Sequence, residues 1–125
     1  MSSENLHAPR ERLSRRTISL HHAVVSLMEE LDAIDWYRQR AEDAEEDSLK
    51  DLLRHNMREE MEHASMLLEW IRRHDKDFEG YLRTYLFTEA PLLEVEHAAE
   101  AAAKGGDAKP SSKSRGFTVG RPGEG

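Results

Sequence analysis

The stretch Arg58-Glu59-Glu60-Met61-Glu62-His63-Ala64-Ser65-Met66 decides how the rest of this 125-residue sequence is interpreted. It places Glu60 and His63 three residues apart, so on a helix both side chains project from the same side of one turn. An ionised carboxylate within a buried row is costly unless it is paired, hydrogen-bonded or bound to a metal. Both residues interrupt an apolar row with helical 4-3-4-3 spacing: Leu49, Leu53, Asn56, Glu60, His63, Leu67 and Trp70.

The same Glu-x-x-His spacing occurs twice more in the chain, but neither of these pairs interrupts an apolar row. Glu4 and His7 lie in a polar stretch that has no apolar periodicity. Glu94 falls on the opposite side of a helix from the apolar row of its own segment, so Glu94 and His97 do not interrupt a core face. Position within an apolar row, rather than spacing alone, therefore selects the pair in the quoted stretch as candidate metal ligands.

The composition fits one charged helical domain with a modest core, with 38% hydrophobic, 34% charged and 6% aromatic residues. A short helical piece buries little apolar area by itself, which favours self-association. The absence of cysteine excludes disulfides and thiolate metal sites. The net charge of −7 disfavours a nucleic-acid partner, and no apolar run is long enough to span a bilayer. With no secretory signal, we expect a cytoplasmic protein without a membrane partner.

Helical periodicity predicts two long helices joined by a short turn. The first runs from near Leu13 to Ala44 and carries two adjoining apolar rows, so we expect it to contact one neighbour within the chain and one from another copy. The acidic run Ala41–Ser48 marks the turn, with Asp47 or Ser48 as the helix cap. The second helix then runs from about Ser48 to His74, and the short connection makes the two helices an antiparallel hairpin.

A shorter third helical segment begins near Lys76, and we expect Pro91 to break or kink it. An alanine-rich helix continues from Leu92 to Lys104. The predicted organisation is a flexible N-terminal arm (1–12), a helical domain (13–104), a flexible linker (105–116) and a terminal motif (117–125).

The first helix supplies a third candidate ligand, Glu30, on its apolar flank. One Glu from one helix and a Glu-x-x-His from another form half of the ligand set of di-iron carboxylate bundles. This chain has one long hairpin, so a second copy must bring the other half. We therefore predict a two-fold dimer that completes a four-helix bundle and holds two irons per subunit pair. Carboxylate oxygens and imidazole nitrogen suit iron or manganese, and other divalent metals such as zinc can also bind.

Tyr37 lies two helical turns after Glu30 on the same row. It is equally well interpreted as a core residue, a hydrogen-bond partner of the ligands or a one-electron donor. Further acidic residues can form an approach for Fe²⁺, although a solvated face is the simpler interpretation of each: Glu29, Asp32, Glu59 and Glu62.

Three runs of sequence together closely resemble encapsulated ferritins: Met28–Tyr37, Glu59–Ala64 and Leu82–Glu89. The resemblance covers roughly Leu20 to Val95. It implies an all-α, ferritin-like fold of two antiparallel helices and a shorter, broken third one. It also implies chains that pair into dimers, with a ferroxidase centre at the dimer interface, and dimers that close into a ring-shaped decamer.

The resemblance also implies roles for individual residues. The family usually has Glu where this chain has Asp32. The implied roles are iron ligands for Glu30, Glu60 and His63, a place beside the catalytic centre for Tyr37 and Trp36, and a metal entrance site for Glu29 with Asp32.

The C-terminal motif resembles the cargo-loading peptides that dock such enzymes inside encapsulin shells. Phe117-Thr118-Val119-Gly120 has the apolar-x-apolar-Gly form. The family then commonly has Ser-Leu and a basic residue, where this chain has Arg121-Pro122-Gly123. The resemblance implies an encapsulin shell protein as partner, and a nanocompartment in the cytoplasm in which the shell stores the iron mineral.

Two other interpretations of the sequence remain. In one, the chain is a non-catalytic helical adaptor that oligomerises through its first helix. Ion pairs, such as Glu60 and His63 with Arg54 or Arg58 of a neighbour, then set the register. In the other, the same ligands serve a manganese or mixed-metal oxidase or peroxidase.

Overall fold

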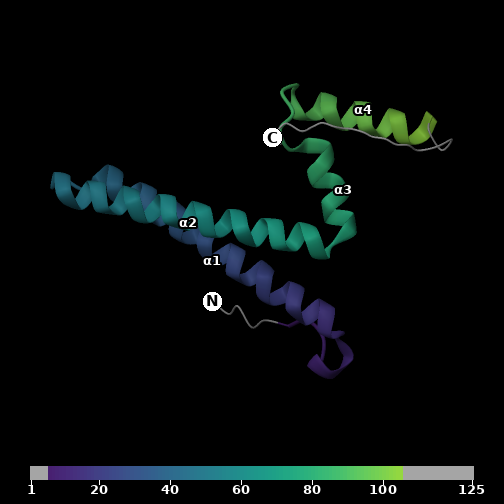
Figure 1. Cartoon of the computed structure of the whole chain (residues 1–125), viewed down its shortest axis with the longest axis horizontal. Helices are drawn as coiled ribbons and strands as arrows, with labels where there is room; N and C mark the ends of the chain where they lie inside the picture. Colours follow the sequence, from purple (N-terminus) through teal and green to yellow (C-terminus); the bar gives the residue numbers. More distant parts are fainter. Residues whose placement is uncertain (1–5, 106–125) are drawn as a thin grey trace. The chain divides into compact units, whose positions relative to one another are not determined.

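The computed structural model describes residues 6–105, and this part of the chain is helical without strands. The predicted all-α class is therefore confirmed. A short 3-10 helix, η1, lies within the arm expected at residues 1–12. In order, the elements are η1 (Arg10–Arg12), α1 (Arg15–Asp43), α2 (Asp47–His74), α3 (Lys76–Tyr85) and α4 (Leu92–Gly105) (Figure 1).

Side-chain caps fix where the two long helices begin. The Ser14 hydroxyl accepts a hydrogen bond from the Thr17 amide at 3.1 Å and starts α1. In α2 the cap is Glu46, whose carboxylate accepts from the Leu49 amide at 3.0 Å. The prediction of Asp47 or Ser48 as the cap is wrong, because the longer Glu side chain reaches the first turn from one residue earlier. Ser48 instead donates its hydroxyl to Glu46.

Helices α1 and α2 lie side by side as an antiparallel hairpin, as predicted (Figure 1). The seam between them is narrow. Small residues let the helices approach closely, and Ile71, which is 2% exposed, fills the space near one end. Full burial of one such side chain contributes about 1.5–3 kcal/mol. The core is thus modest, formed by Ala23, Ile34 and Ala41 of α1 with Ala64 and Ile71 of α2.

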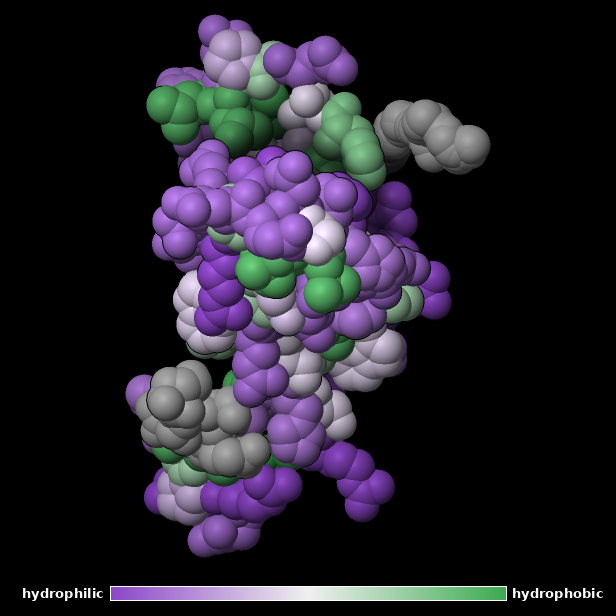
Figure 2. Space-filling model, turned by 90° about the vertical axis from the view of Figure 1, so that its left-hand side faces the viewer, coloured by the Kyte–Doolittle hydropathy of each residue, from purple (hydrophilic) through white to green (hydrophobic). Residues whose placement is uncertain are grey.

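A second apolar row of α1 is left uncovered by the hairpin. Val24, Met28 and Leu31 are 42%, 52% and 53% exposed, although they follow helical spacing as regularly as the buried row. Figure 2 shows hydrophobic side chains (green) exposed among hydrophilic ones (purple). The apolar face of α1 is therefore wider than α2 alone covers, as predicted for the first helix.

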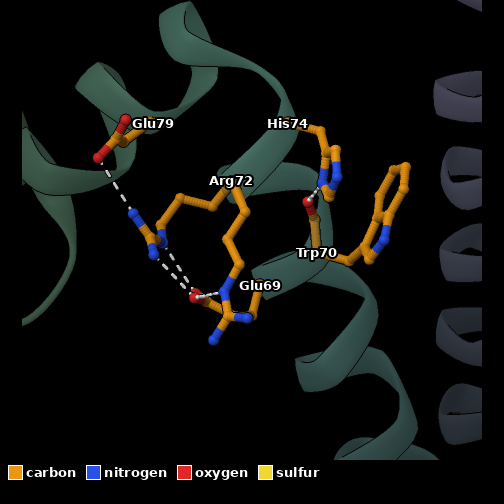
Figure 3. Close-up of polar contacts among 6 residues, drawn as sticks. Glu69, Trp70, Arg72, His74 and Glu79 are labelled. Atoms are coloured by element: carbon orange, nitrogen blue, oxygen red, sulfur yellow. Dashed lines mark hydrogen bonds and ion pairs between the residues drawn. The ribbon is translucent and has the colours of Figure 1, made fainter. Parts of the chain in front are cut away.

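An ion-pair cluster holds the corner between α2 and α3. Arg72 binds the Glu69 carboxylate at 2.8 Å and reaches across the corner to Glu79 at 3.0 Å (Figure 3). Arg73 binds Glu69 from the same side at 2.6 Å. Asp75, between the helices, accepts a hydrogen bond from the Phe78 amide and caps α3. The first turn of α3 is thereby anchored to the end of α2.

The chain divides into two compact units, with the boundary between Glu79 and Gly80. In the second unit α3 ends at Tyr85, well before Pro91, so the expectation that Pro91 breaks this helix is wrong. The break comes at Phe87, whose φ of 63° lies in the left-handed region. Pro91 instead begins the next helix, because its carbonyl accepts the amides of Glu94 and Val95 at 2.9 and 3.1 Å.

Among residues 6–105, no helix combines the length and apolarity needed to cross a bilayer. Apart from Gly105, the expected linker (105–116) and terminal motif (117–125) lie outside the described residues, as do residues 1–5 of the expected arm.

The Glu69 cluster predicts a specific acid dependence of stability. Hydrogen bonds from Arg72 and Arg73 lower the pKa of Glu69 from 4.5 to about 2. A group whose pKa is lower in the folded state stabilises the fold above its unfolded pKa, and this contribution is lost as pH falls from about 4.5 to about 2. Because Glu69 is 41% exposed, we expect Glu69→Gln to cost under about 1 kcal/mol at neutral pH and nothing near pH 2.

Urea unfolding followed by circular dichroism at both pH values measures this difference. Glu42→Gln, on an exposed position of α1, is the matched control and should show no such pH-dependent gap. A Glu69→Gln penalty of equal size at both pH values would contradict the assigned role of the cluster.

Candidate metal centre

The middle of the hairpin brings together the three residues proposed as ligands. Glu30 lies halfway along α1, and Glu60 and His63 lie on one turn of α2 opposite it. One ligand atom from each lies within 4.8 Å of the others, a spacing that a single metal ion can bridge. His63 Nδ1 is 3.0 Å from Glu60 Oε1 and 3.6 Å from Glu30 Oε1. The antiparallel pairing of the two helices therefore creates this group.

The group is half-buried. The side chains of Glu30 and Glu60 are each 24% exposed and that of His63 is 45% exposed. The apolar row around Glu60 was expected to be buried, but in one copy Leu49 is 47% and Trp70 37% exposed. The reason is geometric, since a single neighbouring helix covers only one side of α2. The three ligands thus remain accessible to a metal ion and to a further protein surface.

Mutual contacts shift the pKa values of the group. A hydrogen bond to Glu60 raises the pKa of Glu30, while the same bond lowers the pKa of Glu60. The hydrogen bond with Glu60 raises the pKa of His63, and the nearby carboxylates of Glu30, Glu60 and Glu59 add to that shift. Two carboxylates in contact repel each other unless a proton or a cation lies between them. A divalent cation held between the two carboxylates relieves this repulsion.

The chemistry of the donors fits a hard or borderline metal. Two carboxylates and one imidazole suit iron, manganese or zinc. Iron and manganese prefer about six ligands, and this group offers three residues, so one chain leaves part of the coordination sphere open. The open positions can accept water, a second metal-bridging carboxylate or donors from another copy.

The other residues predicted near the centre lie along α1. The Arg40 guanidinium lies 5.9 Å from the Trp36 ring centroid and 5.8 Å from that of Tyr37, a cation–π arrangement. Sequence reasoning missed Arg40, although its positions three and four residues after these aromatics predict such a contact. Glu29 and Asp32 are exposed on α1 and are not members of the three-residue group.

The two other Glu-x-x-His pairs do not form such a group within the described residues. Glu94 and His97 are exposed on α4, and Glu4 lies outside the residues that the structure describes. Among the described residues, the α2 pair is the one that lies close to a third possible metal ligand, Glu30.

The sequence model of the EncFtn-like family matches residues 5–89, a span that contains all three residues of the group. This chain belongs to the EncFtn-like family. It is 47% identical over 116 residues to the Encapsulated ferritin-like protein of Rhodospirillum rubrum, a match that covers 92% of this chain and 83% of that protein. It is also 39% identical over 107 residues to the Ferritin-like protein of Thermotoga maritima, covering 84% of this chain and 94% of that protein.

A solved structure agrees with the fold of this EncFtn-like chain. The crystal structure of protein ne0167 from Nitrosomonas europaea superposes with a TM-score of 0.68 at 48% sequence identity. The match covers 70% of this chain and 97% of that one. The resemblance to encapsulated ferritins and the ferritin-like helical fold are both confirmed.

We predict that the group binds divalent metal through all three side chains. Glu30→Ala and His63→Ala should each weaken Mn²⁺ binding at least about tenfold, because each removes one of three donors. Loss of the free Mn²⁺ electron paramagnetic resonance signal measures the affinity. Glu94→Ala and His97→Ala, from the pair with the same spacing on α4, are matched controls and should bind Mn²⁺ like the native chain. If the α2 and α4 variants lose Mn²⁺ affinity to the same extent, the Glu30–Glu60–His63 group is not a specific site.

The same site predicts the direction of the pH effect. Metal binding needs the His63 ring nitrogen free of a proton, so metal and proton compete. Because the carboxylates raise the pKa of His63 above its ordinary 6.5, Mn²⁺ affinity should already fall as pH drops from about 8 toward about 6. An affinity that stays constant over this range would contradict the ligand role of His63.

Proposed function

We propose that this chain is a ferroxidase that oxidises Fe²⁺ to Fe³⁺ with oxygen at a di-iron centre shared by two copies. The observation that carries the proposal is the approach of Glu30, Glu60 and His63 to within 4.8 Å on the facing helices of an EncFtn-like chain. Fe²⁺ is here both the metal that binds and the substrate that is consumed. Ferritin-like di-iron proteins hold their metals with single Glu residues and Glu-x-x-His motifs that project from facing helices.

Two copies are proposed because one hairpin supplies too few donors for two irons. A two-fold pair brings four carboxylates and two imidazoles, which offset the four positive charges of two Fe²⁺ ions and stabilise the six of two Fe³⁺. The uncovered row of α1, which includes Met28 and Leu31 beside Glu30, supplies apolar area for the contact. In this arrangement the interface that buries the row also closes the centre.

The reaction must balance the electrons and protons that pass from iron and protein to oxygen. Two Fe²⁺ ions release two electrons, and oxygen that accepts them together with two protons becomes hydrogen peroxide. The contact with Glu60 raises the pKa of the Glu30 carboxyl, which must be ionised to bind Fe²⁺. We assign Tyr37 a place beside the centre as hydrogen-bond partner or one-electron donor, and Glu29 with Asp32 a metal entrance site.

We further propose that the enzyme acts inside an encapsulin nanocompartment in the cytoplasm. The name of the R. rubrum relative, Encapsulated ferritin-like protein, supports this location. The motif Phe117-Thr118-Val119-Gly120, outside the described residues, is the proposed shell-docking peptide. Dimers would assemble into a ring-shaped decamer, and the shell would store the mineral that the enzyme feeds.

Iron oxidation in air tests the proposal. Ferric absorbance after addition of Fe²⁺ should rise at least about tenfold faster with the native chain than with buffer, while Glu30→Ala and His63→Ala fall to the buffer rate. Glu94→Ala and His97→Ala should keep the native rate. An oxygen electrode run in parallel gives the ratio of iron oxidised to oxygen consumed.

The same assay separates the alternatives. If the native chain oxidises Fe²⁺ no faster than buffer, the ferroxidase function is excluded and the chain is better explained as a non-catalytic helical adaptor. Oxygen consumption that requires Mn²⁺, either alone or together with iron, would favour a manganese or mixed-metal oxidase.

The terminal motif gives an independent prediction. Deletion of residues 117–125 should abolish co-purification with a co-expressed encapsulin shell protein and leave iron oxidation by the free enzyme unchanged. Phe117→Ser with Val119→Ser should reproduce the loss, whereas Thr118→Ser should not, because only the flanking apolar residues are expected to dock. Full loading of the truncated chain would refute the role of the motif.

A further inference from the structure

Helix α4 leaves its apolar side chains uncovered (Figure 1). None of its residues, all of which the structure describes, is buried, and Leu92 in its first turn is 62% exposed. Val95 and Ala99 follow Leu92 at helical spacing and are partly exposed. Exposed apolar side chains that gather on one side of a helix mark interaction surfaces in soluble proteins. We call the row Leu92, Val95 and Ala99 the α4 face.

Acidic side chains border the α4 face. Glu96 and Glu100 lie one turn apart beside the apolar row. Partial burial raises the pKa of Tyr85 at the end of α3, and the carboxylates of Glu96 and Glu100 raise it further, so these charges lie near the ring. Within the second unit, residues 80–105 carry more acidic than basic side chains. These charged residues are Glu89, Glu94, Glu96 and Glu100 against Arg83 and Lys104.

The segment 115–121 has the opposite charge pattern around two apolar residues. Phe117 and Val119 lie between Arg115 and Arg121, and residues 106–125 together carry four basic and two acidic residues. This part of the chain lies outside the described residues. Arginine pairs with carboxylates through charge-assisted hydrogen bonds. The segment therefore offers apolar and basic groups that complement an apolar row with acidic neighbours.

We propose that the segment 115–121 docks on the α4 face of its own chain. Phe117 and Val119 cover the apolar row, and Arg115 pairs with Glu100. The spacing agrees with an antiparallel alignment, because four extended residues from Arg115 to Val119 span about 13 Å, and Leu92 lies about 12 Å before Glu100 along the helix axis. With Arg115 at Glu100, Val119 therefore reaches Leu92.

The chain between α4 and the segment is long enough for this contact within one copy. Eleven residues separate Gly105 from Phe117, and a stretch of this length spans at most about 40 Å. Helix α4 is about 21 Å long, so the segment can return along the whole helix. A short linker holds its two ends at an effective concentration of about 1 mM, at which a contact with a Kd of about 0.1 mM is about 90% occupied.

The contact also affects how the chain docks elsewhere, a consequence that rests on the proposed function. Phe117 and Val119 are the residues proposed to bind the shell protein, so that binding requires their release from α4. Until then the α4 face keeps these two apolar side chains covered. The contact uses no residue of the metal group, so it does not depend on iron binding.

Disulfide formation tests the contact in the full-length chain, which contains no native cysteine. Gly116→Cys with Ala99→Cys, on the α4 face, should oxidise within one chain at least about tenfold faster than Gly116→Cys with Ala101→Cys, on the opposite side of α4. The connecting chain has nearly the same length in both, so the ratio of the two rates reports docking rather than reach. Equal rates, or disulfides that form only between chains, would overturn the proposal.

The same ratio of rates tests the ion pair and the apolar contact separately. Glu100→Lys should lower the ratio at least about threefold, and addition of Arg115→Glu should restore it, because the exchanged charges pair again. Phe117→Ser with Val119→Ser should bring the ratio close to one. A ratio that none of these changes moves would overturn the proposal. The measurements contain neither iron nor shell protein, so their outcome is distinguishable from failure of the proposed function.

Discussion

Two carboxylates and an imidazole lie within 4.8 Å of one another at the middle of a helical hairpin, and this crowding is the constraint on which the molecule depends. Without a cation, the two carboxylates repel each other, and their contact raises the pKa of Glu30 and lowers that of Glu60. A divalent metal relieves this repulsion and leaves both carboxylates ionised. Protons and metal therefore compete for the same groups.

The hairpin leaves apolar surface exposed in one copy, just as the metal group leaves coordination positions open. Its core is a narrow seam with few buried residues, one apolar row of α1 is open to solvent, and the metal group is half-buried. A second copy placed on the open row would bury apolar area and supply the missing donors together. In that account stability and chemistry arise from one interface, and metal binding stabilises the assembly because the complete ligand set exists only there.

The sequence allows the hairpin and the three-residue group to be predicted, because helical periodicity and a short turn determine which faces of two antiparallel helices meet. Glu30 and Glu60 both interrupt apolar rows, and rows that face each other bring their interruptions together. Periodicity does not say whether a row is covered, so the half-exposed setting of Leu49 and Trp70 could not be predicted from one chain. The broken third helix was placed at the wrong residue because Pro91 is the obvious helix breaker, whereas a left-handed Phe87 gives no sequence signal.

The central claim is that two chains share one metal centre. Native mass spectrometry of the chain titrated with Fe²⁺ under anaerobic conditions tests it most directly, because it counts metal ions on each oligomer separately. The account predicts that iron appears in pairs on dimers and larger even assemblies, with monomers remaining metal-free. Iron bound one ion per chain to monomers, with the same affinity as to dimers, would contradict it.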